Sequence, residues 1–297
     1  MEYVELGSTG RTVSRLGFGG APAGLTNYLD SYSPADAAQR QRVLEALERA
    51  LELGVTYFDT APAYGNGASE AIYGEVLGDL GDDVFVATKV TTDVSDVRAS
   101  IEGSLERLKR DALDLVQLHG DSYSNAQVEA FLGPDGLVSQ LEALRAEGMI
   151  RHIGFTTEDN NCALYRLINS GRFDVVQMCY NLLYQHPAEW TRPFGSMFEA
   201  EDRGMGIVTM RTVTSGLFQR WVQWANPENS FDYTPALLQF VLSNPMVDVA
   251  LVGMRDAEIV EANVRICEDR SGSVYPPGRI DLRQLHAKYV QERSQNG

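Results

Sequence analysis

The chain has 297 residues, with 25 Lys and Arg against 41 Asp and Glu, so its formal net charge is −16. This length can bury a sizeable core, and a composition of 44% hydrophobic and 22% charged residues excludes a disordered chain. The acidic balance argues against a nucleic-acid or anionic-membrane partner, because both are held by clustered Lys and Arg.

The first residues, MEYVELGSTGRT, carry neither the cationic nor the apolar stretch of a secretory signal. No apolar run approaches the ~20 residues that span a bilayer. The three cysteines, Cys162, Cys179 and Cys267, are far apart and form no C-x-x-C pair, so a reducing compartment fits best. We therefore expect a soluble, cytoplasmic protein.

In chain order, the sequence first predicts a small hairpin, with strands at Tyr3–Leu6 and Thr12–Ser14 around the turn GSTG. Eight short apolar runs then read as strands: Leu16–Gly19, Thr56–Asp59, Phe85–Thr88, Leu113–Leu118, His152–Thr156, Val175–Met178, Ile207–Met210 and Val249–Val252. Between and after them, three- and four-residue apolar spacing predicts helices at Gln39–Leu53, Ala68–Leu80, Val94–Leu108, Leu137–Glu147, Cys162–Ser170, Met197–Arg203, Pro235–Leu242 and Ala257–Cys267.

Eight strand–helix units in one chain predict an α/β fold, a (β/α)₈ TIM barrel that occupies residues 1–297 as a single domain. The rival is a doubly wound sheet, which normally carries a G-x-G-x-x-G turn after its first strand. Here Pro22 stands in place of the third glycine, so that fingerprint is absent. The polar stretch 270–297 is expected to wrap the barrel as a C-terminal tail.

Four reactive residues fall at predicted strand ends or just after them. Asp59 ends the second strand, with Tyr64 in the following loop, Lys89 ends the third and His119 ends the fourth. In a barrel such positions face one active site. Taken singly, each could instead be structural: a capping Asp, a packed Tyr, a solvated Lys and a hydrogen-bonded His.

Together the four residues suit the reduction of a carbonyl group. A carbonyl that takes up a hydride develops negative charge on oxygen and needs a proton. We expect the Lys89 ammonium to lower the pKa of Tyr64 from ~10, Asp59 to hold Lys89, and a neutral His119 to orient the carbonyl.

Two motifs surround these residues. One is Phe58-Asp59-Thr60-Ala61-Pro62-Ala63-Tyr64-Gly65-Asn66-Gly67-Ala68-Ser69-Glu70, and the other is Ser104-Leu105-Glu106-Arg107-Leu108 with Asp114-Leu115 and His119 downstream. With the LGSTGRTVSRLGFGG, IRHIGFTT and LVGMRDAEIVEAN segments, they resemble the aldo-keto reductase superfamily over nearly the whole chain.

The resemblance implies a (β/α)₈ barrel that binds NADPH in extended form and reduces an aldehyde or ketone. It implies Tyr64 as general acid, Lys89 and Asp59 as its tuners, and His119 as the orienting group. It also implies a cofactor site formed by Gly20, Asp59, Thr156, Gln177, Arg211, Gly216, Leu217, Met254, Arg255 and Asn263. No metal site is expected.

The chain departs from the family pattern in the cofactor site. Thr156-Thr157 replaces the usual Ser-Asn pair, so one contact to the nicotinamide amide is missing. Arg211 stands where many members stack an aromatic ring; it could lie flat on the nicotinamide or pair with a carboxylate instead. Arg255 is the one cation offered to a 2′-phosphate, although it could equally be a solvent-exposed residue at a helix start. NADPH is favoured, with NADH an alternative.

Two other functions remain open at this point. The chain could be a cofactor-binding regulatory subunit of the same fold with little turnover. It could also be a metal hydrolase built on Asp59, His119 and Asp121, although it lacks an H-x-H after the first strand.

The expected substrate is a small carbonyl compound or an aldose. Tyr28, Tyr32 and Tyr123 suggest stacking on a sugar or an aromatic aldehyde. Specificity is expected from residues 21–35, 120–130, 212–229 and 271–283, and the oligomeric state is left open. Aromatic residues at 218, 221 and 224 could wall the pocket or pack as an amphipathic stretch.

Overall fold

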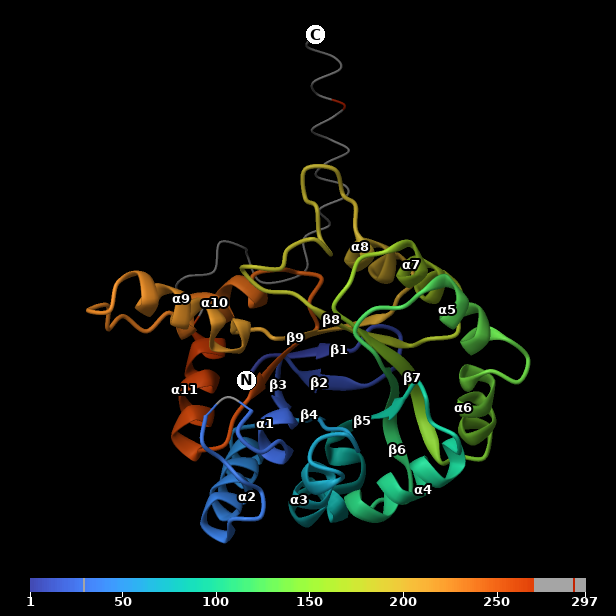
Figure 1. The fold of residues 1–297 in the computed structure, drawn as a ribbon, viewed down its shortest axis with the longest axis horizontal. Coiled ribbons are helices and arrows are strands. Elements are labelled where there is room, and N and C mark those ends of the chain that lie inside the picture. The colour runs from blue at the N-terminus through green and yellow to red at the C-terminus, as the bar shows by residue number, and fades with distance from the viewer. Residues whose placement is uncertain (29, 270–290, 292–297) are drawn as a thin grey trace.

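A computed structural model describes residues 1–28, 30–269 and 291. Eight parallel strands close into a barrel in the order β10-β3-β4-β5-β6-β7-β8-β9 (Figure 1). Their bounds are β3 Leu16–Gly19, β4 Tyr57–Asp59, β5 Phe85–Thr91, β6 Leu113–His119, β7 Ile150–Thr157, β8 Val175–Cys179, β9 Gly206–Met210 and β10 Val249–Gly253. The strands read as near-continuous apolar runs because both faces of a parallel barrel are buried. The predicted (β/α)₈ barrel is confirmed.

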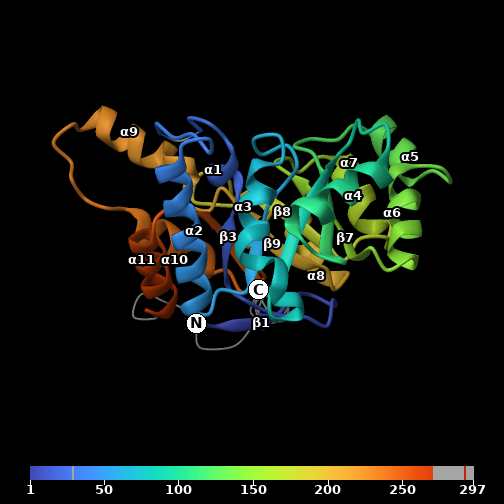
Figure 2. The ribbon, with the colours of Figure 1, turned by 90° about the horizontal axis from the view of Figure 1, so that it is seen from below.

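Helices surround the barrel, as both views show (Figures 1 and 2). They are α2 Ala37–Glu52, α3 Ala68–Leu77, α4 Val97–Leu108, α5 Asn125–Leu132, α6 Leu137–Ala146, α7 Cys162–Asn169, α8 Ser196–Asp202, α10 Thr234–Leu242 and α11 Ala257–Glu268. Several begin at polar caps: the side chains of Asp36, Asp96 and Asn161 each accept a hydrogen bond from a backbone N–H in the first turn.

Three segments outside the predicted helices also contain helices. These are α1 (Ala21–Gly24), α5, and α9 (Leu217–Ala225), which follows a 3₁₀ turn, η2 (Thr214–Gly216). A capping box formed by Ser124 and Gln127 starts α5, so a helix signal was present in the sequence. Figure 2 shows α9 standing out from the side of the barrel.

Two predicted ends are also corrected. The strand β5 runs two residues past Lys89 to Thr91, so Lys89 lies inside the strand and not at its end. The helix predicted to reach Leu80 ends as α-helix at Leu77 and continues as a 3₁₀ helix, η1 (Gly78–Asp83).

The predicted hairpin, β1 (Tyr3–Glu5) and β2 (Thr12–Ser14), is antiparallel and lies at the end of the barrel opposite α1 (Figure 2). Leu6 and Val13 belong to the same buried cluster as Tyr57 and Phe85, which point into the barrel. The hairpin therefore closes this end of the barrel with apolar side chains, and the opposite end is left for chemistry.

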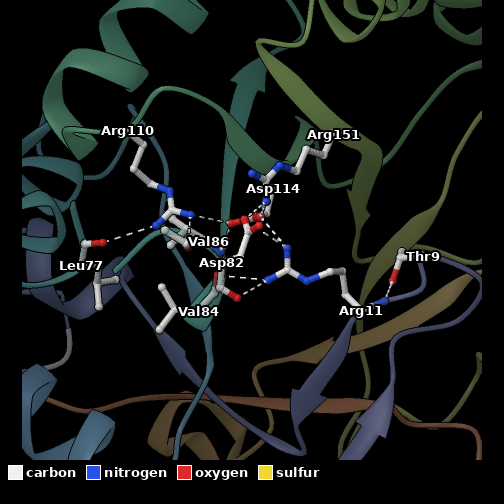
Figure 3. A network of polar contacts seen from close by, with 10 residues as sticks. Thr9, Arg11, Leu77, Asp82, Val84, Val86, Arg110, Asp114 and Arg151 are labelled. Atoms are coloured by element: carbon white, nitrogen blue, oxygen red, sulfur yellow. Dashed lines mark hydrogen bonds and ion pairs between the residues drawn. The ribbon is translucent and has the colours of Figure 1, made fainter. Parts of the chain in front are cut away.

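A buried carboxylate, Asp114, ties the hairpin to the barrel strands (Figure 3). Its oxygens accept hydrogen bonds from Arg11 at 3.2 Å, Arg110 at 3.1 Å, Arg151 at 2.9 Å and the backbone N–H of Val86 at 2.9 Å. These partners come from the hairpin, the end of α4, β7 and β5. Asp114 thus joins four separate segments at one point.

The predicted C-terminal tail, including residues 271–283, lies outside the described residues apart from residue 291. In the part of the chain that the structure describes, none of the helices has the length and apolar character to cross a bilayer.

Candidate active site

The four candidate catalytic residues meet at one cavity at the carboxyl ends of the strands. The cavity has a volume of about 290 Å³, and Asp59, Tyr64, Lys89 and His119 all line it. They come from β4, the loop after β4, β5 and β6, which are neighbours in the barrel. The predicted convergence of these side chains is therefore confirmed.

Asp59 and Lys89 form a buried ion pair. Lys89 Nζ donates to Asp59 Oδ1 at 2.7 Å, to Oδ2 at 2.8 Å and to the carbonyl oxygen of Thr60 at 2.7 Å. Burial opposes a charge on Lys89, but Asp59 and Tyr64 together raise the pKa of the ammonium above its ordinary value. Lys89 is therefore positively charged at neutral pH and fixed in place.

Tyr64 is half-buried and faces both Lys89 and His119. Lys89 Nζ lies 4.9 Å from the centroid of the tyrosine ring, and the His119 ring meets it edge-on with centroids 5.6 Å apart. Burial raises the pKa of the Tyr64 phenol, and the Lys89 charge opposes the rise without cancelling it. The expectation of a lowered tyrosine pKa is wrong here, and the phenol stays protonated at neutral pH.

His119 is uncharged at neutral pH. Burial and, second to it, the Lys89 charge lower the pKa of its imidazole from 6.5 to about 4. A neutral imidazole can donate one N–H to a carbonyl oxygen, as the sequence predicts, and does not add a second cation beside Lys89.

Other residues of the two motifs support the site from behind. The buried Glu70 accepts from Thr88 Oγ1 at 2.6 Å and from Arg107 Nε at 2.7 Å, which joins α3 to β5 and α4. A turn with positive φ at Gly65, Asn66 and Gly67 leads from Tyr64 into α3. A Cβ at Gly65 would lie 2.1 Å from the carbonyl oxygen of Gly24, so only glycine fits there.

Further residues surround the four catalytic candidates. Tyr28 and Asp121, which the sequence offered in other roles, line the cavity, and so does Glu158, which was not singled out. Gln117 lies under it, fully buried, and contacts Asp59. The alternation of β6 places Gln117 on the same face as His119, so a glutamine in an otherwise apolar strand was the signal that could have found it.

The predicted cofactor residues divide into two groups. Those that line the cavity are Gly20, Asp59, Thr156, Gln177, Arg211 and Gly216. Those outside its lining are Leu217, Met254, Arg255 and Asn263, and of these Met254 and Asn263 are buried. Thr157, at the position of the missing amide, donates its hydroxyl to backbone carbonyls of Asp121 and Asp159.

Arg211 pairs with a carboxylate, which is one of the two interpretations offered by the sequence, and stacking on a nicotinamide stays a prediction. It lines the cavity, and its guanidinium also forms an ion pair with Glu158. Its backbone has a φ of 55°, and its carbonyl accepts a hydrogen bond from Asn181 at 2.9 Å. The pairing with Glu158 cancels most of the positive charge that Arg211 would bring to the cavity.

Arg255 lies at a second cavity of about 300 Å³, which is lined by Asp30, Ser31, Tyr32, Gln39, Arg42, Arg255 and Asp256. Its guanidinium forms an ion pair with Asp30 and stacks 4.4 Å from the centroid of the Tyr32 ring. The side chain is only 15% exposed, so it is not a free surface residue.

The aromatic side chains have separate roles. Tyr28 lines the cavity, whereas Tyr32 and Tyr123 are buried and donate their hydroxyls to backbone carbonyls. Trp221 and Trp224 on α9 are exposed and lie outside the cavity lining. Of Tyr28, Tyr32 and Tyr123, only Tyr28 lines the cavity, and its contact with a substrate stays a prediction.

The family model described as the aldo/keto reductase family matches residues 15–235. "Uncharacterized oxidoreductase YqkF" of Bacillus subtilis is 26% identical, over 73% of this chain and 66% of that protein. L-galactose dehydrogenase of Arabidopsis thaliana is 28% identical, over 89% of this chain and 87% of that protein.

Among solved structures, an aldo-keto reductase from Klebsiella pneumoniae in complex with NADPH has a TM-score of 0.67 to this chain. The two are 23% identical, and the match covers 94% of this chain and 98% of the other. At this identity the likeness shows the shared fold.

Proposed function

The chain belongs to the aldo/keto reductase family, and from that premise we propose that it reduces a carbonyl compound with a nicotinamide dinucleotide, using Tyr64 as the proton donor. The observation that carries the proposal is the meeting of Tyr64, Lys89, Asp59 and His119 at one cavity. A protonated phenol beside a fixed ammonium is suited to give a proton to a developing alkoxide.

The residues around the cavity suit a nicotinamide ring. Gln177 lines it, and its Nε2 donates to the weak acceptor Met210 Sδ at 3.8 Å, while its amide also contacts Asp59. The amide of Gln177 can bind a carboxamide. Gly20, Gly216 and Gly253 bring backbone to the wall without side chains. The volume is at the small end for a ligand pocket, which leaves the rest of a dinucleotide outside it.

When bound, NADPH would supply the hydride. Tyr64 then gives its phenolic proton to the substrate oxygen, and His119 donates an N–H to the same oxygen and orients the carbonyl. Lys89 stabilises the phenolate that remains, because its ammonium lies against the tyrosine ring. Asp59 keeps Lys89 in that position.

A small polar carbonyl, such as an aldose, is the substrate class that we favour. Besides the four catalytic candidates, the wall carries Tyr28, Asp121 and Glu158, which can bind hydroxyl groups. The similarity to L-galactose dehydrogenase supports a sugar over a purely apolar aldehyde.

Arg255 is the residue that we expect to choose between NADPH and NADH. Because Asp30 already pairs with Arg255, a 2′-phosphate has to compete with this carboxylate, and the preference for NADPH is modest. Arg255→Ala should weaken NADPH binding about tenfold and leave NADH binding almost unchanged.

The matched variant, at Asp30, should change NADPH affinity in the opposite direction. Asp30→Asn frees Arg255 from its carboxylate and should tighten NADPH binding. Titration of both dinucleotides by fluorescence checks this pair of variants. An equal loss of NADPH and NADH affinity in Arg255→Ala would remove Arg255 from the phosphate site.

The proposed activity is tested by a screen of aldehydes, ketones and aldoses with NADPH and NADH in both directions. We expect a loss of NADPH absorbance that matches the alcohol formed. Tight dinucleotide binding without turnover of any carbonyl compound would instead favour a regulatory subunit.

A further inference from the structure

Gln117 has a single chemically sensible orientation in the barrel. Its Nε2 donates to Asp59 Oδ2 at 3.3 Å and to Gln177 Oε1 at 3.1 Å. The reversed amide would point its carbonyl oxygen at the Asp59 carboxylate, which repels it. Both N–H groups are therefore used, and both point at residues of the candidate active site.

The barrel makes room for this long side chain. Gly154 on β7 pairs with Gln117 in the sheet, and a Cβ at Gly154 would lie 3.1 Å from Gln117 Cγ and 2.7 Å from the carbonyl oxygen of Val175. A side chain at residue 154 would press on the backbone of β8 and on Gln117, so the glycine leaves room for the glutamine.

A polar side chain at this place has a cost. Gln117 is fully buried, and among the described residues its Oε1 has no hydrogen-bond partner. Leu115, two residues earlier on the same face, is apolar, and a Leu or Met at residue 117 would avoid an unpaired buried oxygen. Packing alone therefore does not explain the glutamine.

The contact with Asp59 does explain it. Burial raises the pKa of the Asp59 carboxyl, and Lys89 together with the amides of Gln117 and Gln177 opposes that rise by favouring the carboxylate. Gln117 approaches Oδ2, which also receives Lys89 Nζ, so the amide holds the carboxylate plane from the side of β6.

We propose that Gln117 is a positioning residue for the reaction: its amide fixes the Asp59 carboxylate and thereby holds Lys89 against Tyr64. The expected effect on the reaction rate depends on the proposed function. Gln117 does not touch the reacting atoms, and it links the Asp59–Lys89 pair to Gln177 beneath the cavity.

Gln117→Met and Gln117→Glu have side chains of similar size and should change the pH dependence of kcat in opposite ways. Gln117→Met removes both N–H donors, so kcat should fall roughly tenfold and the acid limb of kcat should move to higher pH, because Asp59 takes up a proton more readily. KM for the carbonyl should change little.

Gln117→Glu keeps a donor only while the introduced carboxyl is protonated. Its kcat should therefore be closest to the native value at low pH and should fall as pH rises, when a second carboxylate forms beside Asp59. The same two substitutions at Gln41 are the control, since its Nε2 also donates to a carboxylate, Glu45 at 3.1 Å, but on the exposed side of α2.

A second measurement needs no turnover. Burial and the charge of Asp59 should raise the pKa of the introduced carboxyl in the folded state above its unfolded value near ~4.3. The folded state then binds more protons than the unfolded state, so Gln117→Glu loses stability as pH rises from that value to the raised folded-state pKa. Gln117→Met raises the folded-state pKa of Asp59, so its loss of stability is smallest where Asp59 is protonated and becomes constant once Asp59 is ionised. Chemical denaturation over a pH series measures this difference.

The outcomes separate the two claims. If the native protein turns over no carbonyl compound, the proposed function fails, and the stability series still decides whether Gln117 holds Asp59. The positioning role is overturned if Gln117→Met keeps the native rate and pH profile. It is also overturned if both variants lose rate or stability equally at every pH.

Discussion

Replacing Tyr64 by Phe should lower kcat for carbonyl reduction by at least ~10²-fold, because a positioned general acid contributes about that much. The substitution removes only the phenolic hydroxyl. The ring, which meets His119 edge-on and lies 4.9 Å from Lys89 Nζ, is kept. Binding of NADPH and the stability of the fold should therefore be almost unchanged. Steady-state rates together with a dinucleotide titration check both parts.

The control for this variant is Tyr3→Phe. Tyr3 lies on β1 at the closed end of the barrel and is 47% exposed, so its hydroxyl is far from the cavity. It should keep the native rate. If Tyr64→Phe keeps its rate within about threefold of the native protein, another group donates the proton.

The largest effect on stability is expected at the other end of the barrel. Asp114→Asn keeps the volume of the side chain but removes the charge that faces Arg11, Arg110 and Arg151 (Figure 3). Asp114 is fully buried, and the Arg110 side chain is only 4% exposed, so a guanidinium is left buried without its carboxylate. We expect a loss of about 3–5 kcal/mol in the free energy of unfolding.

Asp82→Asn is the matched control, because Asp82 pairs with two of the same arginines but its side chain is 72% exposed. Denaturant unfolding should find it close to the native protein. Equal stability of the two variants would mean that the Asp114 cluster does not hold the hairpin to the barrel.

The strands could be predicted from the sequence because parallel barrel strands are apolar on both faces and bounded by turns. The catalytic candidates could also be predicted, because in this fold the residues at strand ends meet whatever their separation in sequence. The segments 217–225 and 125–132 were not assigned as helices. The first has helical apolar spacing, but its aromatic residues were also interpreted as a pocket wall, and the second has a capping box that was overlooked.

Charge pairing was the part that the sequence could not reveal. Lys89, Arg211 and Arg255 are the cations that the sequence offers to the candidate site, but each is paired with a carboxylate, namely Asp59, Glu158 and Asp30. Those acids come from distant segments, and their side chains meet only in the folded barrel. The same is true of Gln117, whose partner Asp59 lies 58 residues away.

The pH dependence of the two directions of reaction tests the central claim most directly. The pKa of Tyr64 is raised, so the phenol is the dominant form at neutral pH and the phenolate forms only in alkali. Reduction needs the phenol and should decline as pH rises through that pKa, whereas oxidation of the alcohol needs the phenolate and should increase over the same range. We expect the rate of reduction to fall and the rate of oxidation to rise around the same pKa, and we expect both pH dependences to vanish in Tyr64→Phe. If both rates change with pH in the same direction, or if either pH dependence persists in Tyr64→Phe, Tyr64 is not the proton donor.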